Sequence, residues 1–402
     1  MEIKNTMKEV KNYQKTKLAC YLGFVTQAIV ANFVPLLFLT FYRTYGISYA
    51  DLALIPLAFF LTQLIVDFLC AKFVDRIGYR KSIVISQIMS GVGLIMLAFV
   101  PDLCQHSFAG ILLSVIIYSI GSGLIEVLCS PIIEACPFEG KARMMSLLHS
   151  FYCWGVVGTI LGSTAFFLIF GTENWRILAC LWAVIPLYNI FNFISCPIEP
   201  IVNEGESMTI SQLLKTKTFW LFIVLMVCAG ASELSMAQWA SAFAESALGV
   251  TKTAGDLLGA CGFAVFMGLS RMLYGKYGEK VNLSGFMIAS GVLCLCSYLL
   301  AAFAKWPVMG LLGCMLCGFS VGIMWPGSIS ISSARLPRGG TALFALLAMA
   351  GDSGGAIGPA LVGTVSHLQG ENIRAGILIG ICFPIVLALS VFMVDGHIYR
   401  KQ

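Results

Sequence analysis

Long apolar runs alternate with short polar gaps along almost the whole chain. Twelve runs reach the length of about 20 residues that a helix needs to cross a bilayer. Proline, glycine or charged residues mark the gaps, as at Pro101-Asp102. The pattern predicts an all-α polytopic membrane protein with twelve transmembrane helices. Their expected bounds are 18–41, 50–71, 82–100, 108–135, 145–170, 176–197, 218–243, 254–274, 283–303, 308–333, 341–366 and 374–394.

Composition supports lipid as the solvent for much of the chain. Of 402 residues, 58% are apolar and 11% are charged, whereas soluble domains carry about 25% charged residues. The first 17 residues are polar and contain five lysines, and the apolar run that follows is too long for a signal-peptide core. We therefore expect the first helix to remain in the mature protein.

Lysine and arginine positions predict the orientation of the helices. With both termini and alternate loops on one side, that side holds 20 of the 25 cations, Arg271 among them. An odd number of crossings would distribute the lysines and arginines more evenly between the two sides. We expect both termini to be cytoplasmic, in a multi-pass protein of the plasma (cytoplasmic) membrane.

Net charge and cysteine content exclude two other classes of protein. The charge of +5 lies in loops rather than along one polar face, which argues against a nucleic-acid partner. The 15 cysteines lack the paired spacing of a zinc site, and we interpret them as small hydrophobic thiols. No metal or cofactor is expected.

The chain divides into two similar halves around a polar connector. We expect an N-terminal six-helix bundle at 1–197, a cytoplasmic linker at 198–217 and a C-terminal six-helix bundle at 218–402. Shifting the second half by 200 positions aligns Arg76-Ile77-Gly78 with Lys276-Tyr277-Gly278, and Pro137 with Pro337. Such repeats predict two pseudo-symmetric bundles, rocker-switch alternating access and a substrate site between the halves near the bilayer midplane.

The loop between the second and third helices carries a recognisable signature. It reads Ala71-Lys72-Phe73-Val74-Asp75-Arg76-Ile77-Gly78-Tyr79-Arg80-Lys81. This resembles the loop signature of the major facilitator superfamily, with Ala71 at its usual first glycine. The resemblance implies a gate loop whose residues are Asp75, Arg76, Gly78, Arg80 and Lys81. The alternative is a cationic anchor at the membrane surface.

Four acidic residues fall inside the predicted helices at least four residues from either end, at Asp67, Glu126, Glu233 and Asp352. An ionisable group there costs roughly 3 kcal/mol or more at the midplane, so each is a candidate for proton coupling. We place Asp67 about one turn from the end of its helix. No lysine or arginine is expected in the middle of any span. This charge balance favours a neutral polar solute, a cationic solute or proton coupling; alternatively, each acid only hydrogen-bonds a neighbouring helix.

The fourth helix adds a second resemblance. Its segment Gly123-Leu124-Ile125-Glu126-Val127-Leu128-Cys129-Ser130-Pro131 resembles that of fucose-permease-like sugar–proton symporters, where a glutamate precedes Asn-Pro. The resemblance implies a role for Glu126 in proton coupling and sugar contact, with Ser130 in place of the amide. The first helix has no acid and offers Gln27 and Asn32 for substrate binding.

The seventh helix places Glu233 near Gln238 and Trp239, and the tenth contains Trp325. Amides and indole rings suit a sugar-like ligand, because polar groups bind hydroxyls and a ring covers an apolar face. Members of the same symporter branch resemble this arrangement. The alternative is that these tryptophans serve packing or interfacial anchoring.

We therefore expect a monomeric secondary transporter that carries a small-molecule substrate, such as a sugar, by proton symport. Efflux or exchange of an organic cation remains an alternative, as does a receptor on the same scaffold. No catalytic motif such as HExxH or a nucleotide-binding glycine-rich loop is present, so an enzyme is not expected.

Overall fold

The computed structural model describes residues 2–47, 49–199, 207–251, 254–370 and 372–399. Within them, twelve helices are long and apolar enough to cross a membrane, which confirms the predicted number and the all-α class. Of the predicted linker, residues 200–206 lie outside the described residues, and the division at 198–217 stays a prediction.

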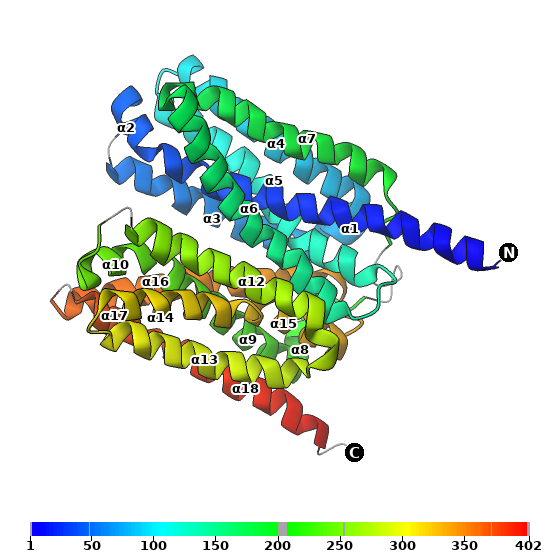
Figure 1. Cartoon of the computed structure of the whole chain (residues 1–402). Coiled ribbons are helices and arrows are strands. Elements are labelled where there is room, and N and C mark those ends of the chain that lie inside the picture. The colour runs from blue at the N-terminus through cyan, green and yellow to red at the C-terminus, as the bar shows by residue number, and fades with distance from the viewer. Residues whose placement is uncertain (1, 48, 200–206, 252–253, 371, 400–402) are drawn as a thin grey trace. The chain divides into compact units, whose positions relative to one another are not determined.

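Most helices of the first half, shown in Figure 1, are longer than the predicted spans, but the helix in the span 176–197 is slightly shorter and the span 18–41 is interrupted after Asn32. A helix can continue from an apolar run into the polar residues beside it until a helix-breaking or capping residue ends it. The bounds are α1 Glu2–Asn32, η1 Val34–Leu37, α2 Phe38–Tyr45, α3 Tyr49–Ile77, α4 Tyr79–Leu103, α5 Ser107–Ala135, α6 Lys141–Phe170, η2 Thr172–Asn174 and α7 Trp175–Ser195.

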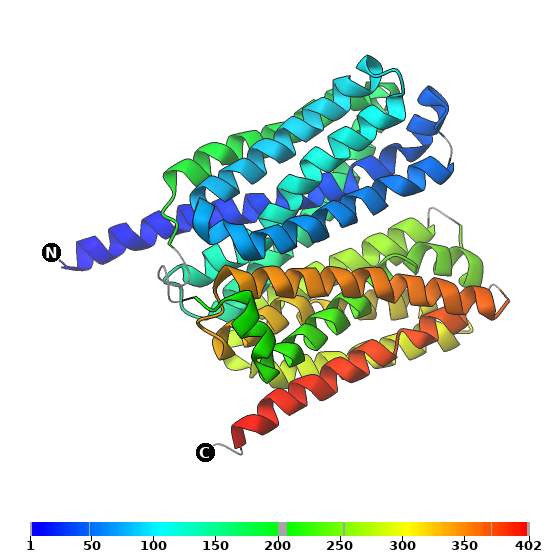
Figure 2. The same cartoon turned by 180° about the vertical axis from the view of Figure 1, so that it is seen from behind.

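The second half has more interruptions, as Figure 2 shows from behind. A π-helical turn precedes α12, and the span 307–335 is broken between α14 and α15. The bounds are α8 Ile210–Lys215, α9 Lys217–Ala237, α10 Ala240–Leu248, η3 Gly255–Cys261, α12 Gly262–Tyr277, η4 Gly278–Lys280, α13 Leu283–Phe303, α14 Pro307–Val321, α15 Met324–Arg335, α16 Gly340–Leu368, α17 Ile373–Ile379 and α18 Cys382–Tyr399.

Two compact units contain the described helices. Unit 1 comprises residues 1–138, 154–207 and 340–345, and unit 2 comprises 139–153, 208–339 and 346–402. Helix α6 therefore contributes its first half to unit 2 and its second half to unit 1. The first turns of α16 belong to unit 1 in the same way.

In unit 1, α4 packs against α5 and α7. A buried aromatic cluster forms part of the core, where the rings of Phe41 and Trp175 meet edge to face with centroids 5.3 Å apart. Outward-facing apolar side chains remain exposed, such as Leu168 at 82%. Exposed apolar surface of this kind is expected where lipid is the solvent.

The internal repeat is visible in the contacts of each unit. Gly91 of α4 faces Leu187 of α7, and Gly291 of α13 faces Ala388 of α18. Each glycine allows the sixth span of its half to approach the third span closely. The offset of 200 residues predicted from sequence therefore relates equivalent helix pairs.

A second repeated contact fixes the start of the last helix in each half. Arg176 at the start of α7 forms an ion pair with Asp102 at 2.7 Å. Arg374 at the start of α17 donates to the carbonyl oxygens of Ala302 and Ala304, at 3.0 and 2.6 Å. Asp102 and Ala302 are 200 positions apart, so the same turn is anchored by an arginine in both units.

Candidate functional site

Unit 1 contains a carboxylate held by two side-chain amides. The Oε2 atom of Glu126, on α5, accepts hydrogen bonds from Gln27 Nε2 of α1 and Gln63 Nε2 of α3, each at 2.8 Å. Both glutamines are buried, at 7% and 3% exposure, while Glu126 is half-buried. Hydrogen bonds to a carboxylate are stronger than those between neutral groups. Two predicted site residues, Gln27 and Glu126, are thus in direct contact.

Glycines one turn before these side chains explain the close approach of the three helices. A Cβ atom on Gly123 of α5 would lie 3.0 Å from Val66 of α3 and 3.5 Å from the Cα of Gln63. A Cβ atom on Gly23 of α1 would lie 3.0 Å from the Sγ of Cys129. Small residues at these positions allow α1 and α3 to bring their amides to Glu126.

One hydrogen-bond acceptor in this cluster, on Gln27, has no donor among the described residues. Within the part of the chain that the structure describes, the Oε1 atom of Gln27 is buried and has no hydrogen-bond partner. An unsatisfied buried acceptor costs about 1–3 kcal/mol. A bound molecule with an O–H or N–H donor would remove that cost.

The predicted residues Asp67 and Ser130 lie one turn further along the same two helices. Asp67 follows Gln63 on α3 and is fully buried, and Ser130 follows Glu126 on α5 and is 2% exposed. The expectation that Asp67 lies one turn from its helix end is wrong. Helix α3 continues to Ile77, so Asp67 lies ten residues inside it.

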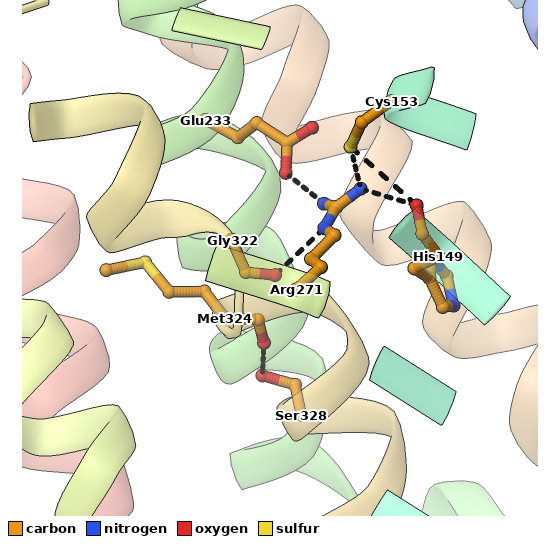
Figure 3. A network of polar contacts seen from close by, with 7 residues as sticks. All are labelled: His149, Cys153, Glu233, Arg271, Gly322, Met324 and Ser328. Carbon is orange, nitrogen blue, oxygen red and sulfur yellow. Dashed lines mark hydrogen bonds and ion pairs between the residues drawn. The ribbon is translucent and has the colours of Figure 1, made fainter. Parts of the chain in front are cut away.

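Unit 2 contains a buried ion pair, which Figure 3 shows from close by. Arg271 Nη2 lies 3.0 Å from Glu233 Oε2, and the two side chains are 3% and 13% exposed. The expectation that no lysine or arginine occupies the middle of a span is therefore wrong. The span that contains Arg271 runs to Lys280, which places Arg271 nine residues, or about 14 Å, inside it.

Backbone oxygens and a thiol complete the surroundings of Arg271 (Figure 3). Its Nε atom donates to the carbonyl of Gly322 at 2.9 Å, where the break between α14 and α15 frees this oxygen. Its Nη1 atom lies 3.2 Å from the carbonyl oxygen of His149 and 3.1 Å from Cys153 Sγ, both on α6. Four acceptors on three other segments thus fix one guanidinium.

The predicted tryptophans of unit 2 pack against α16. Trp239 Nε1 donates to the carbonyl of Pro359 at 3.0 Å. The ring of Trp325 lies against Gly351, where a Cβ atom would come within 2.3 Å of it. Asp352 follows Gly351, and its Oδ2 atom is buried without a hydrogen-bond partner among the described residues.

Two predicted substrate-binding residues do not join either cluster through a hydrogen bond of the described structure. Asn32 Nδ2 donates to the carbonyl of Ala28 in its own helix, at 2.9 Å. Gln238 lies at the end of α9 with an exposed side chain. Their roles as binding residues stay predictions.

In the predicted gate loop, Asp75 contacts the start of α16 inside unit 1. Thr341 Oγ1 donates to Asp75 Oδ1 at 2.6 Å, and the hydroxyl of Tyr79 contacts the same Thr341 oxygen. Gly78 has φ +92°, which favours glycine at the junction of α3 and α4.

The cations of this loop differ in their surroundings. Arg80 donates to the carbonyl oxygens of Phe193 and Ile194, at 2.8 and 2.7 Å, at the end of α7. A cation is favourable there because it meets the negative end of the helix dipole. Arg76 and Lys81 are exposed.

Sequence reasoning missed three residues of these clusters. Gln63 is a neutral amide in an apolar run and gives no charge signal. Arg271 was assigned to a loop because it lies near the end of the predicted span 254–274. Thr341 is one of many small polar residues, although its place at a helix start beside a positive-φ Gly340 is a usable signal. Among the described residues, no group of three or more His, Cys, Asp or Glu side chains could hold a metal ion.

Comparisons with known proteins agree with this architecture. Residues 19–359 match the family described as the Major Facilitator Superfamily. A search of curated proteins found no significant match.

Several solved transporters have similar structures. One is FucP in an outward conformation, with 16% identity and a TM-score of 0.80, covering 94% of this chain and 98% of that one; a variant of the same protein is described as the E. coli fucose:proton symporter. Another is the proton:xylose symporter XylE, with 15% identity, a TM-score of 0.78 and 95% coverage of both chains. A third is the human organic anion transporter TETRAN, with 16% identity, a TM-score of 0.73, and 94% and 99% coverage.

Proposed function

Because the chain belongs to the major facilitator superfamily, we propose that this secondary transporter couples the uptake of a small neutral polar solute, such as a sugar, to protons. The single observation that carries the proposal is the position of Glu126 between the amides of Gln27 and Gln63. A carboxylate inside a membrane-spanning helix can exchange a proton, and amides beside it can hold hydroxyl groups.

The unsatisfied Oε1 atom of Gln27 supports a solute rich in hydrogen-bond donors. Hydroxyl groups can donate to this oxygen and to the carboxylate of Glu126. A site with buried acceptors that need hydrogen-bond donors binds solutes without hydroxyl groups poorly, because those acceptors would stay unpaired. The names of two similar structures, a fucose:proton symporter and a proton:xylose symporter, favour the same solute class.

The buried cation of unit 2 does not favour an anionic solute. Arg271 is compensated by Glu233, and its other contacts are carbonyl oxygens and a thiol. An anion would have to displace Glu233 to reach the guanidinium. A neutral solute needs no such exchange.

The coupling acid can be tested with the full-length protein in proteoliposomes. With a pH gradient imposed (acidic outside), we expect the wild type to accumulate one or more members of a panel of labelled monosaccharides and polyols. Glu126→Gln should abolish gradient-driven accumulation and leave counterflow exchange at least partly active, because an amide cannot release a proton. Glu245→Gln, at an exposed acid of α10, is the matched control. Accumulation by Glu126→Gln at the wild-type rate would refute the assignment.

Efflux or exchange of an organic cation is the second candidate. It is favoured by Asp352, whose buried Oδ2 atom has no partner among the described residues. Competition by organic amines in vesicles, with and without a pH gradient, separates the two functions. Solute binding without any accumulation or exchange would instead indicate a receptor.

The orientation is part of the proposal. The excess of lysine and arginine in alternate loops supports cytoplasmic termini in the plasma membrane. Labelling of cysteines placed near either terminus in intact cells and in opened cells would test it.

A further inference from the structure

Helix α6 changes its surroundings at Cys153. Residues up to Cys153 pack within unit 2, and residues from Trp154 onward pack within unit 1. Beyond this point, Gly155 lies against Val25 and Ala28 of α1, whereas a Cβ atom on Gly158 would have no neighbour within 4 Å. The first half of α6 is thus held by contacts different from those that hold the second half.

Arg271 provides several of the polar contacts that hold the first half, and Arg143 adds an ion pair with Glu279. Its guanidinium donates to the His149 carbonyl and to Cys153 Sγ, at 3.2 and 3.1 Å. Its own carbonyl accepts a hydrogen bond from Ser146 Oγ at 2.8 Å. At the start of the helix, Arg143 Nε donates to the carbonyl of Gly275 at 2.9 Å.

The position of Arg271 depends on the charge of Glu233. Removing one partner of a buried ion pair leaves the other charge uncompensated, which is strongly unfavourable. The other titratable groups near the pair are the side chains of Tyr152, Cys153, His149 and Cys317. Phenol, thiol and imidazole groups carry no negative charge near neutral pH. None of them can replace Glu233 as the counter-ion.

Glu233 is also the more accessible partner of the pair. Its side chain is 13% exposed and that of Arg271 is 3% exposed. In Figure 3 its second carboxylate oxygen points away from the guanidinium. A proton or a solute can therefore reach the anion of the pair before the cation.

We propose that the Arg271–Glu233 pair is a charge-controlled clamp on the first half of α6. While Glu233 is ionised, Arg271 stays in place and binds His149 and Cys153. When Glu233 loses its charge, the guanidinium of Arg271 leaves its buried position to regain water, and the segment 149–153 is released. Arg271 acts here as a positioning residue. The clamp goes beyond the proposed function, because it operates whatever the solute is.

Cys153 is a built-in reporter of this release. It is fully buried, as are Cys294 and Cys314 of the same unit, which make no contact with Arg271 or Glu233 in the interactions described. Alkylation of each cysteine by N-ethylmaleimide can be followed by peptide mass spectrometry, with the full-length protein in proteoliposomes. In Glu233→Gln we expect Cys153 to react at least about tenfold faster than in the wild type, because local opening exposes it. Cys294 and Cys314 should react at their wild-type rates.

Two further variants separate charge from packing. Glu233→Asp keeps the negative charge on a shorter side chain, so Cys153 should stay protected. The double variant Glu233→Gln/Arg271→Gln has no uncompensated charge but also lacks the guanidinium that binds His149 and Cys153, so Cys153 should stay as reactive as in Glu233→Gln. Wild-type reactivity of Cys153 in Glu233→Gln would overturn the clamp. So would a rise shared by Cys294 and Cys314, which would show general unfolding, or equal exposure of Cys153 in Glu233→Asp.

Discussion

Arg271 and Glu233 form an ion pair of 3.0 Å within a membrane-spanning unit, and both side chains are largely buried. The pair changes the charge balance of the interior, because a cation stands beside one of the four acids. The other three acids, Asp67, Glu126 and Asp352, stay predicted candidates for proton coupling. Of these, Glu126 is the one that two amides hold.

Removing either partner of the pair should destabilise the protein more than removing both. We expect Arg271→Met and Glu233→Leu each to lower the thermal transition markedly, because a buried charge without a partner costs about 3–5 kcal/mol. The double variant Arg271→Met/Glu233→Leu should recover most of the loss. Thermal unfolding of the purified protein in detergent measures this, and an additive loss in the double variant would contradict the coupling.

Gln63 should be needed for transport although it carries no charge. In Gln63→Leu the Oε2 atom of Glu126 loses one of its two donors, which is worth about 1.5–3 kcal/mol for a charged acceptor. We expect the counterflow rate to fall by about tenfold or more. Thr62→Val is the matched control, because Thr62 bonds only to Ala58 of its own helix in the contacts described, at 2.7 Å. Equal rates in the two variants would exclude a role for Gln63.

Replacing glycine by alanine should destabilise the protein where two helix backbones are in contact and should be tolerated where no neighbouring helix is close. In Gly230→Ala the new methyl group would lie 2.0 Å from the carbonyl oxygen of Gly351, so α9 and α16 must move apart. We expect a loss of about 1–3 kcal/mol, as for overpacking in a core. Gly158→Ala should be tolerated, because among the described residues no atom outside the adjoining turns of its own helix lies within 4 Å of the added Cβ. Thermal stability of the two variants, compared side by side, gives the answer.

The contact between Thr341 and Asp75 should affect the rate of transport. Thr341→Val keeps the shape of the side chain and removes the hydroxyl that donates to Asp75 at 2.6 Å. If the loop acts as a gate, initial uptake should slow several-fold with little change in the half-saturating solute concentration, because the solute contacts are untouched. Thr341→Ser should retain the wild-type rate. A change in half-saturation alone would argue against a gate.

The sequence predicts the framework of this protein well for physical reasons. Apolar runs of bilayer length determine the helices, and the offset of 200 residues predicts the paired contacts at Gly91 and Gly291. Glu126 is predictable because a charge inside an apolar run is costly. Gln63 is not predictable in this way, because a neutral amide inside a helix costs little free energy. Its role depends on which helix it faces, and the sequence does not show that.

The misplacement of Arg271 has a different cause. Its predicted span ends at residue 274, but α12 continues to Tyr277 and is followed by a short turn to Lys280. A helix rises about 1.5 Å per residue, so a few residues at the end decide whether a cation meets water or the interior. Pairing with Glu233, 38 positions earlier, appears only once the helices are folded together.

The glycine contacts between α9 and α16 also determine how unit 2 can move. Gly230 meets the carbonyl of Gly351, and Gly354 meets that of Val227, so the two backbones interlock without side chains between them. Neither helix can rotate or slip along the other by a fraction of a turn. We therefore expect a rigid-body movement of α9 to carry α16 with it, so that the backbones at Glu233 and Asp352 move together.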